Sequence, residues 1–499
     1  MDFDAERQSL LNGTDTTGDY HDVRDSRRSQ FGGALRIWNT PVGDSVGAKY
    51  VPLDEIDFEK RDWVPYSGWP FKRSELDRYY TRAEKICELS EIGYEADNWE
   101  AGQSCSIKFI DGDAVTQIYK LGSSAPFLET ARRRVAASSE IDCLLWATAI
   151  ELVPATGTTR IKSLTVLAAN KKRIEIRATI FVLAAGGIEN PRLLLASNRH
   201  WPAGVGNSSD LVGRFLMDHP IYYFTELVPD NPGLFQTFGF YDVRVVNRAH
   251  VLGRLTLTEE TLRKHRLLNL SVVFYPKRRG YRSRGVEALR QIRFRLRGQK
   301  RRMALELAPQ LCGHAFDVAA YAWRRVAFPS VPPSHFWSNI RNPHKAFQTF
   351  EPEFYLEQPP DPANRVFIAP EKDSTGLPKT LIRWEWGEQS KRSAEKSRII
   401  LDSSLQGAGI GSLRLLDYPR VNPSAHHHLG TTRMHDAPTQ GVVNVNCRVH
   451  ETNNLYVVGG SVFPTGGFAN PTLTIVALSI KLSDHLKKRL QPPMVVRSE

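Results

Sequence analysis

One C-terminal stretch constrains the fold more than any other part of the chain. Residues 455–458 form a short apolar run that ends in two glycines, which predicts a buried strand. Asn470 and Pro471 then precede an apolar run that is long enough for a buried helix. Asn is a favoured N-cap and Pro a favoured first helical residue, so we expect the helix to begin there. A glycine pair after a strand, followed by a helix start, lets the backbone approach a bound anion or an electron-rich ring.

The same order of strand, glycine pair and helix occurs earlier in the chain. Residues 180–184 are apolar and are followed by Gly186 and Gly187, and residues 188–197 have helical spacing. Apolar and polar residues alternate on both sides of a polar turn at residues 170–172, which predicts a β-hairpin before this unit. We interpret the glycines here as serving tight packing between strand and helix.

Three consecutive histidines, His426, His427 and His428, precede the pair Gly430-Thr431. An imidazole can accept a proton near neutral pH, so one of them is a candidate general base. A structural role and a metal site are the alternatives. Three consecutive residues rarely bind one metal well, and no Asp or Glu stands at ligand spacing on a shared helix face, so we predict no metal site.

The blocks His427-x-x-Gly430-Thr431, 457–464 and Asn470-Pro471-Thr472 resemble the C-terminal signature of the glucose–methanol–choline (GMC) family of flavin-dependent alcohol oxidoreductases. Their order and spacing also fit that family. Five further segments resemble it, so the resemblance spans almost the whole chain: residues 31–38, 57–70, 182–197, 211–220 and 357–366.

The resemblance implies a mixed α/β fold, in which a Rossmann-like FAD-binding domain is interleaved with a substrate domain built on an antiparallel sheet. The FAD-binding domain is expected to comprise residues 1–56, 140–216 and 425–499. The substrate-binding domain is expected to comprise residues 57–139 and 217–424, with a basic helical insert at 277–327.

The resemblance also implies chemistry, namely oxidation of a CH–OH group in an alcohol or sugar-like substrate by hydride transfer to flavin N5. His427 takes the position of the base, and Asn470 that of the residue that hydrogen-bonds the substrate oxygen. His219, in residues 211–220, is interpreted as structural. The helix start would stabilise negative charge on the reduced flavin. The expected cofactor-binding residues are Gly32, Gly33, Gly460, Ser461, Asn470, Pro471 and Thr472.

The chain departs from the family at its start, where no G-x-G-x-x-G dinucleotide fingerprint is present. We expect that the protein lacks its N-terminal βαβ unit because about 35–45 upstream residues are missing from the sequence, the length such a unit requires. A degenerate copy is the alternative. It leaves open a second function class, a catalytically inactive flavoprotein remnant with a binding role.

Charge and composition limit the kinds of partner that the protein can have. Of the net charge of +12, residues 277–302 contribute nearly all, with twelve Lys or Arg and one acidic residue. A solvated basic face and a membrane-surface contact remain open, and the apolar stripe Val286, Leu289, Ile292 and Leu296 argues against nucleic acid. No apolar run is long enough to span a bilayer, and the polar start is not a signal peptide, so we expect a cytoplasmic protein. Oxygen, a quinone and a redox protein remain alternatives as the electron acceptor.

Overall fold

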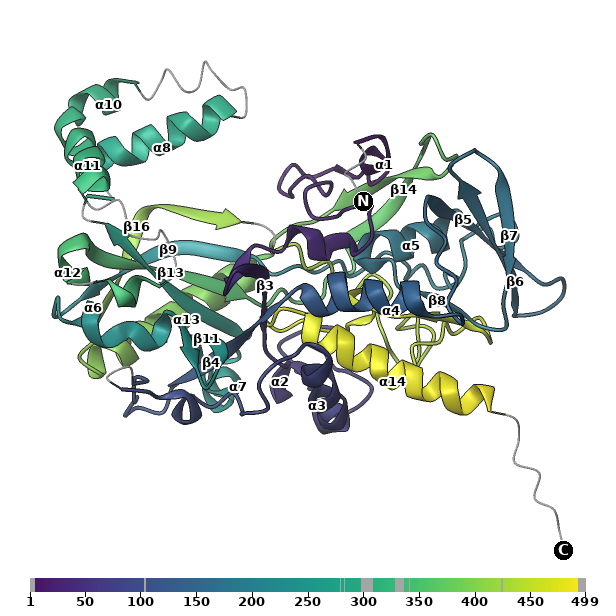
Figure 1. The fold of residues 1–499 in the computed structure, drawn as a ribbon, viewed down its shortest axis with the longest axis horizontal. Coiled ribbons are helices and arrows are strands. Elements are labelled where there is room, and N and C mark those ends of the chain that lie inside the picture. The colour runs from purple at the N-terminus through teal and green to yellow at the C-terminus, as the bar shows by residue number, and fades with distance from the viewer. Residues whose placement is uncertain are drawn as a thin grey trace, which may run out of the picture.

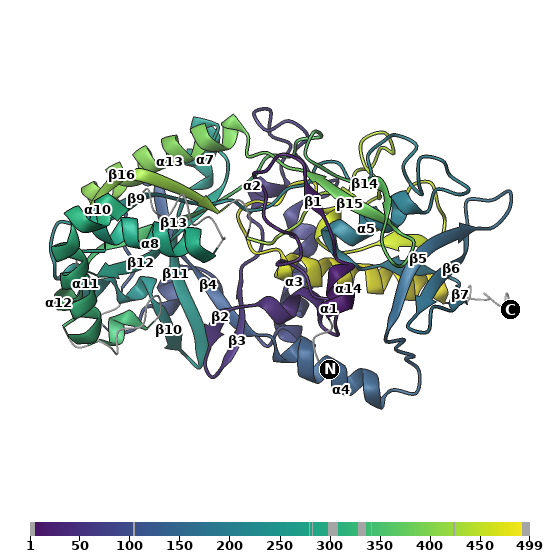
Figure 2. The ribbon, with the colours of Figure 1, turned by 90° about the horizontal axis from the view of Figure 1, so that it is seen from above.

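The computed structural model describes residues 5–102, 105–278, 280–281, 283–297, 308–327, 336–340, 342–422 and 425–491. A large antiparallel sheet occupies one half of the molecule, and smaller sheets with helices α5 (Gly186–Ala196) and α14 (Thr472–Leu490) occupy the other (Figures 1 and 2). Each half is built from segments that lie far apart in the sequence.

The large sheet has nine strands, which join segments far apart in the sequence. Its neighbouring strands pair in antiparallel fashion, and β10 (Val243–Val246) pairs with β11. The order along the sheet is β16 (Gly411–Asn422), β9 (Ile221–Pro229), β13 (Phe347–Leu356), β12 (Leu270–Arg278), β11 (Ala249–Leu257), β4 (Ala114–Ser123), β3 (Ser45–Tyr50) and β2 (Thr40–Val42).

One face of this sheet is an apolar core. Side chains alternate between the two faces of a strand, and every second residue of the central strands enters this core. Helix α13 (Glu388–Gly407) covers it with Ala394, Leu401 and Leu405. The sheet residues of this core include Leu255, Val272, Phe274, Phe350 and Phe354.

The smaller half is built around two short parallel strands, β17 (Leu455–Val457) and β8 (Phe181–Leu183). Both lie where the sequence predicts strands. The expected hairpin turn lies between β6 and β7, and β6 also pairs with β5, which gives a sheet with the order β5, β6, β7. Another sheet has the order β1, β15, β14. These strands are β5 (Ala147–Pro154), β6 (Ile161–Ala168), β7 (Arg173–Arg177), β1 (Thr14–Asp15), β15 (Pro378–Arg383) and β14 (Arg365–Lys372).

Helix α14 begins one residue later than predicted. Pro471 occupies the cap position and the helix runs from Thr472, so Asn470 lies outside it. Helix α3 (Asp77–Ile86) packs against α14, with a hydrogen bond between the Tyr80 and Thr474 hydroxyls at 2.9 Å. The short helices elsewhere are α1 (Ala5–Ser9), α2 (Glu55–Phe58), α4 (Ala131–Ala137), α6 (Leu234–Thr237), α7 (Glu259–His265) and α12 (Pro343–Ala346).

The basic insert is helical, as predicted, although residues 277–278 still belong to β12. It contains α8 (Arg284–Arg297), α10 (Ala308–Gly313) and α11 (Ala315–Ala327), which lie together at one end of the molecule, outside the large sheet (Figure 1). Residues 298–307 of the basic segment lie outside the described residues. No helix in the described ranges is long and apolar enough to cross a membrane.

Candidate active site

The carboxylate of Asp218, which is fully buried, holds the histidine run in place. Its Oδ1 accepts hydrogen bonds from the backbone N–H groups of Ala425, His427 and His219, at 3.1, 3.0 and 2.7 Å. Its Oδ2 accepts from the Tyr20 hydroxyl at 2.6 Å. Because one charged group receives donors from three segments of the chain, the backbone of the run is fixed on both sides of His426.

His427 contacts a second histidine that the sequence interpretation had set aside as structural. Its Nδ1 lies 3.0 Å from Nδ1 of His219, which is 1% exposed. Burial first, and then the neighbouring His219, hold the pKa of His427 well below its usual value. Burial also lowers the pKa of His219. Half-buried His427 is therefore neutral at physiological pH, the protonation state that a general base requires.

The two other histidines of the run have different surroundings. His426 is exposed, has a positive φ of 66°, and places its Nδ1 3.1 Å from Nε2 of His21. His428 lies with its Nε2 3.4 Å from the Ser26 hydroxyl. Burial lowers the pKa of His428 to about 3 and that of His21 to about 4. The run thus contributes one outward and two inward-facing rings.

Two glycines at the ends of the parallel strands expose bare backbone. Gly459 follows β17 with a φ of 119°, Gly186 follows β8 with a φ of 83°, and an added Cβ on either would meet nothing within 4 Å. Because β17 and β8 are adjacent and parallel, both glycines lie at the same edge of the pair. In open α/β sheets that edge is where ligands bind. Gly187, in contrast, packs as predicted, since a Cβ there would lie 2.3 Å from the His428 carbonyl oxygen.

The Gly460-Ser461 turn is joined to the histidine motif through the backbone. The N–H of Gly430 donates to the Gly460 carbonyl at 3.1 Å, and that of Thr432 to the Ser461 carbonyl at 2.7 Å. The Ser461 hydroxyl is fully buried and receives hydrogen bonds from Asn190 and Thr432. If Ser461 contacts a cofactor, the contact is therefore made by its backbone atoms.

The segment between this turn and Asn470 is held by contacts with residues 57–69. The Thr465 hydroxyl donates to the Asp57 carbonyl at 2.5 Å and accepts from the Trp69 indole at 3.0 Å. A Cβ on Gly467 would lie 2.3 Å from the Asp57 carboxylate. Asn470 itself is half-buried and directly precedes the start of α14. No contact in the described chain joins it to His427. Asn470 follows the clamped segment, and His219, the partner of His427, lies against that segment: its Nε2 would be 3.2 Å from a Cβ on Gly466.

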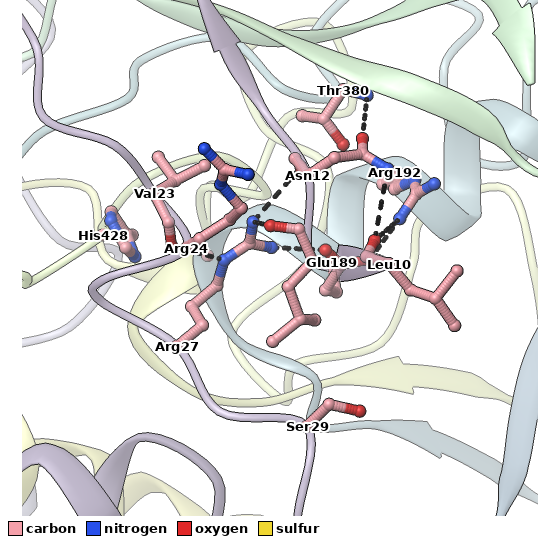
Figure 3. Close-up of polar contacts among 12 residues, drawn as sticks. Leu10, Asn12, Val23, Arg24, Arg27, Ser29, Glu189, Arg192, Thr380 and His428 are labelled. Carbon is pink, nitrogen blue, oxygen red and sulfur yellow. Dashed lines mark hydrogen bonds and ion pairs between the residues drawn. The ribbon is translucent and has the colours of Figure 1, made fainter. Parts of the chain in front are cut away.

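The N-terminal segment is clamped onto α5 by two arginines (Figure 3). Arg27 pairs with Glu189 and donates to the Leu11 carbonyl at 2.7 Å. Arg192 donates to the Leu10 carbonyl at 3.1 Å and pairs with Asp373 at 2.6 Å. These contacts bring Tyr20, His21 and Ser26 to the histidine run.

The predicted glycine loop follows this clamp. Gly32 and Gly33 have φ values of 94° and 52°. A Cβ on Gly32 would overlap Leu128 at 2.2 Å, whereas one on Gly33 would meet nothing within 4 Å. Gly32 therefore packs, and Gly33 leaves its backbone open to a ligand.

These features fit the flavin end of FAD. Gly33, Gly186 and Gly459 offer open backbone, and the first N–H groups of α14 have no intrahelical acceptor and favour negative charge. Among the described residues, no group of three or more His, Cys, Asp or Glu side chains could hold a metal ion. The arrangement fits a flavin site, and the role of each residue in it stays a prediction.

Comparison with known proteins gives the family. Residues 360–479 match the C-terminal family model described as GMC oxidoreductase. Residues 360–479 therefore form a GMC oxidoreductase C-terminal domain, and the cofactor of this family is FAD. The chain is 28% identical over 343 residues to the fructose dehydrogenase large subunit of Gluconobacter japonicus, covering 66% of this chain and 51% of that one. It is 28% identical over 321 residues to 2-methyl-1,2-propanediol dehydrogenase of Mycolicibacterium austroafricanum, covering 64% and 49%.

The chain thus spans about half the length of the curated relatives it matches. Among solved structures, an FAD-dependent oxidoreductase from Chaetomium thermophilum aligns over 98% of this chain and 93% of its own, with a TM-score of 0.50 and 14% identity. The predicted fold class, a mixed α/β protein with a Rossmann-like FAD domain and an antiparallel-sheet substrate domain, is confirmed. The exact domain boundaries and site residues stay predictions.

Sequence reasoning missed Asp218, Tyr20 and the part played by His219. Asp218 and His219 lie in residues 211–220, which resemble the family. The sequence Asp-His-Pro in that segment could have marked the two residues as candidates for the site. Tyr20 carries no such signal, since its role depends on a contact with a residue 198 positions away.

Proposed function

We propose that the protein oxidises a CH–OH group of a small alcohol or sugar-like substrate to a carbonyl group, with FAD as the immediate acceptor. The observation that carries this is the contact between His427 and His219. With Nδ1 of His427 engaged at 3.0 Å, its Nε2 is the nitrogen left to take a proton.

The steps balance as a two-electron oxidation. The substrate hydroxyl gives its proton to Nε2 of His427, the same carbon gives up a hydrogen with its electron pair, and the C–O bond becomes C=O. FAD, when bound, supplies the hydride acceptor. Asn470 orients the substrate oxygen through its side-chain amide. The fixed N–H groups at the start of α14 stabilise the negative charge that develops on the cofactor side.

The named activities of two relatives support a hydroxyl compound as substrate. One is a fructose dehydrogenase large subunit and the other a 2-methyl-1,2-propanediol dehydrogenase. The test is anaerobic mixing of the FAD-loaded protein with a panel of alcohols, polyols and sugars while the visible flavin absorbance is followed. Bleaching by at least one compound, lost in His427→Ala, supports the proposal. A protein that holds oxidised FAD and is bleached by none of them contradicts it.

A second candidate function is association with an anionic membrane surface. Phe316, Trp323 and Val326 on α11 are 86%, 67% and 76% exposed and lie on one side of that helix. Contiguous apolar surface of this kind commonly marks a site of interaction with a protein or a membrane. Helix α11 lies beside α8, and α8 belongs to residues 277–302, which carry nearly all the excess positive charge. A negatively charged lipid surface is therefore the complementary partner.

A further inference from the structure

An open pocket lies between the N-terminal segment and the hairpin of β14 and β15. Its volume is about 530 Å³, and it is lined by residues 9–10, 12–14 and 372–374 together with Arg24 and Lys379. The Asn12 amide oxygen accepts a hydrogen bond from the Thr380 N–H at 3.1 Å, which joins the two walls (Figure 3). None of the histidines or open glycines of the candidate active site lines this pocket, so it is a separate space. We call it the N-terminal pocket.

A buried arginine behind the pocket fixes both of its walls. Arg192 is 2% exposed, and its Nε donates to the Pro378 carbonyl at 2.9 Å. The same guanidinium donates to the Asp373 carboxylate at 2.6 Å and to the Leu10 carbonyl at 3.1 Å. Because one planar group with several donors holds residues of both walls, their positions are set without a ligand.

The lining of the pocket carries more positive than negative charge. It has three cations and one carboxylate, that of Asp373, so its net charge is 3 − 1 = +2. The cations are Arg24, Lys372 and Lys379. The Asp373 carboxylate is already engaged, since Oδ2 accepts from Arg192 and Oδ1 accepts from the N–H and the hydroxyl of Thr375 at 2.8 and 2.5 Å. The single acidic group is therefore not available to neutralise the lysines.

The two lysines are the groups that a ligand would neutralise. Arg24 pairs with Asp22, whereas Lys372 and Lys379 have no ion-pair partner among the residues that the structure describes. They stand on neighbouring strands, because Lys372 pairs in register with Pro378. Two ammonium groups beside one opening repel each other, and an anion bound between them is attracted by both.

The chemistry of the lining selects an anion with several charges and several oxygens. An ammonium group donates hydrogen bonds and accepts none, and the hydroxyls of Thr14 and Ser374 supply further donors. One carboxylate would balance a single lysine, and a neutral sugar would balance neither. A phosphate group carries roughly two negative charges at neutral pH and has acceptor oxygens on several sides, which suits two separate point charges.

The segment that lines the pocket also reaches the histidine run. Thr14 and Asp15 form β1, and the Asp15 carboxylate accepts from the N–H of Tyr20 at 3.0 Å. The Tyr20 hydroxyl donates to Asp218 at 2.6 Å, and Asp218 accepts from the N–H of His427 at 3.0 Å. A ligand that holds one side of this segment therefore also restrains the residues that position the proposed base.

We propose that the N-terminal pocket binds a phosphate-bearing anion, with Lys372 and Lys379 as its main charge partners, and that the bound anion restrains residues 12–28 against the histidine run. The pocket takes no part in the oxidation itself, since no proton or hydride passes through it. A free phosphorylated metabolite and the diphosphate of FAD share this chemistry, and the experiment distinguishes the two sources.

The test is calorimetric titration of the protein with inorganic pyrophosphate at low ionic strength, in its FAD-loaded and FAD-free forms. We expect one site per chain, and about tenfold or more weaker binding in Lys372→Gln with Lys379→Gln, because two charge-assisted hydrogen bonds are lost. Lys372→Arg with Lys379→Arg keeps both charges and should stay within about threefold of the native affinity. The control is Lys162→Gln with Lys172→Gln, which removes the same charge from exposed lysines of the β6–β7 hairpin and should not weaken binding.

The control variant separates the pocket from general attraction to a protein with a net charge of +12. If pyrophosphate saturates no site in either form of the protein, or if the Gln pair and the control pair bind it equally, the proposal is overturned. Equal binding in both forms supports the pocket and identifies a free metabolite as the source. Binding that occurs in the FAD-free form alone, and that FAD displaces, supports the pocket and identifies the diphosphate of the cofactor.

Hydrogen exchange tests the restraint separately from binding. At saturating pyrophosphate, we expect backbone exchange in residues 12–28 to slow by about threefold or more in the native protein and in the Arg pair, and to stay unchanged in the Gln pair. Residues 161–177 serve as the internal reference. If exchange in residues 12–28 does not change although the site is saturated, the restraint is refuted. Neither measurement involves turnover, so a failure of the proposed oxidation leaves both results interpretable.

Discussion

The Nδ1 atoms of His219 and His427 lie 3.0 Å apart, so the pair shares one Nδ1 proton. If that proton is on His427, its Nε2 has a free lone pair and can act as a base. If it is on His219, Nε2 of His427 carries a proton and cannot. The proposed reaction therefore requires His219 to accept, which makes it a positioning residue that selects the tautomer of His427.

Replacing the proposed base should remove flavin reduction by substrate while the flavin stays bound. For His427→Ala we expect the rate to fall by roughly 10²–10⁴-fold, the usual contribution of a general base. His426→Asn is the control, because His426 is exposed and Asn tolerates its positive φ. Stopped-flow bleaching and flavin content are measured in both variants. Equal loss in the control would mean that the run acts as a unit or that the base is misassigned.

The positioning role of His219 predicts rescue by a side chain that can accept a proton. His219→Leu removes the acceptor, and His219→Asn keeps a side-chain oxygen near Nδ1 of His427. We expect the Leu variant to lose most of the base contribution, up to roughly 10²-fold, and the Asn variant clearly less. The pH profile of flavin reduction is the second readout, because a changed environment of His427 moves its lower limb. If both variants lose the same amount of thermal stability, and both keep the pH profile of the native protein, His219 contributes packing alone and does not position His427.

Local elements could be predicted from the sequence, and contacts between distant segments could not. Strand β17, strand β8 and the turn before β7 follow from short apolar runs and turn residues, which act locally. The start of α14 was one residue off, since Asn and Pro both suit several cap positions. The pairing of Asp218 with Tyr20 and His427 depends on how the halves of the chain meet. The apolar stripe that the sequence predicted lies on α8, where Val286 is fully buried, whereas the exposed apolar side chains lie on α11. Which of two neighbouring helices has its apolar side covered depends on tertiary packing.

Buried neutral histidines should make the protein sensitive to acid. The pKa of His428 is lowered by burial from 6.5 to about 3, so the unfolded chain binds a proton that the folded chain refuses between those pH values. This contribution to stability is fully present above pH 6.5 and is lost progressively as the pH falls toward 3. Between pH 6.5 and 5 the loss for this one group is roughly 2 kcal/mol, from 1.36 kcal/mol per pH unit.

The corresponding measurement is urea unfolding at a series of pH values. His428→Gln removes the titrating ring but keeps an amide group near the Ser26 hydroxyl. We expect the variant to be less stable at pH 7 and to lose stability less steeply between pH 6.5 and 5. An unchanged slope would show that His428 is protonated in the folded protein or is exposed to solvent.

The exposed stripe on α11 predicts binding to anionic lipid that needs both apolar and basic side chains. Each basic residue near an anionic surface contributes about 1 kcal/mol, an attraction that falls off within a Debye length, so binding should weaken steeply with salt. In sedimentation with liposomes, we expect the native chain to pellet with anionic vesicles at low salt and little with neutral ones.

Two variants and one control divide the contributions. Phe316→Ser with Trp323→Ser should reduce pelleting even at low salt, because the aromatic rings no longer enter the interface. Changing Arg290, Arg293, Arg297 and Arg301 to Gln should reduce the salt-dependent part; the side chains of these arginines lie outside the described residues. Ile110→Ser is the control, since Ile110 is 94% exposed in a loop outside the basic insert and should not matter. If binding to anionic vesicles does not change with salt, or is equal in all these proteins, lipid binds elsewhere on the protein. In that case α8 and α11 have no role at the membrane.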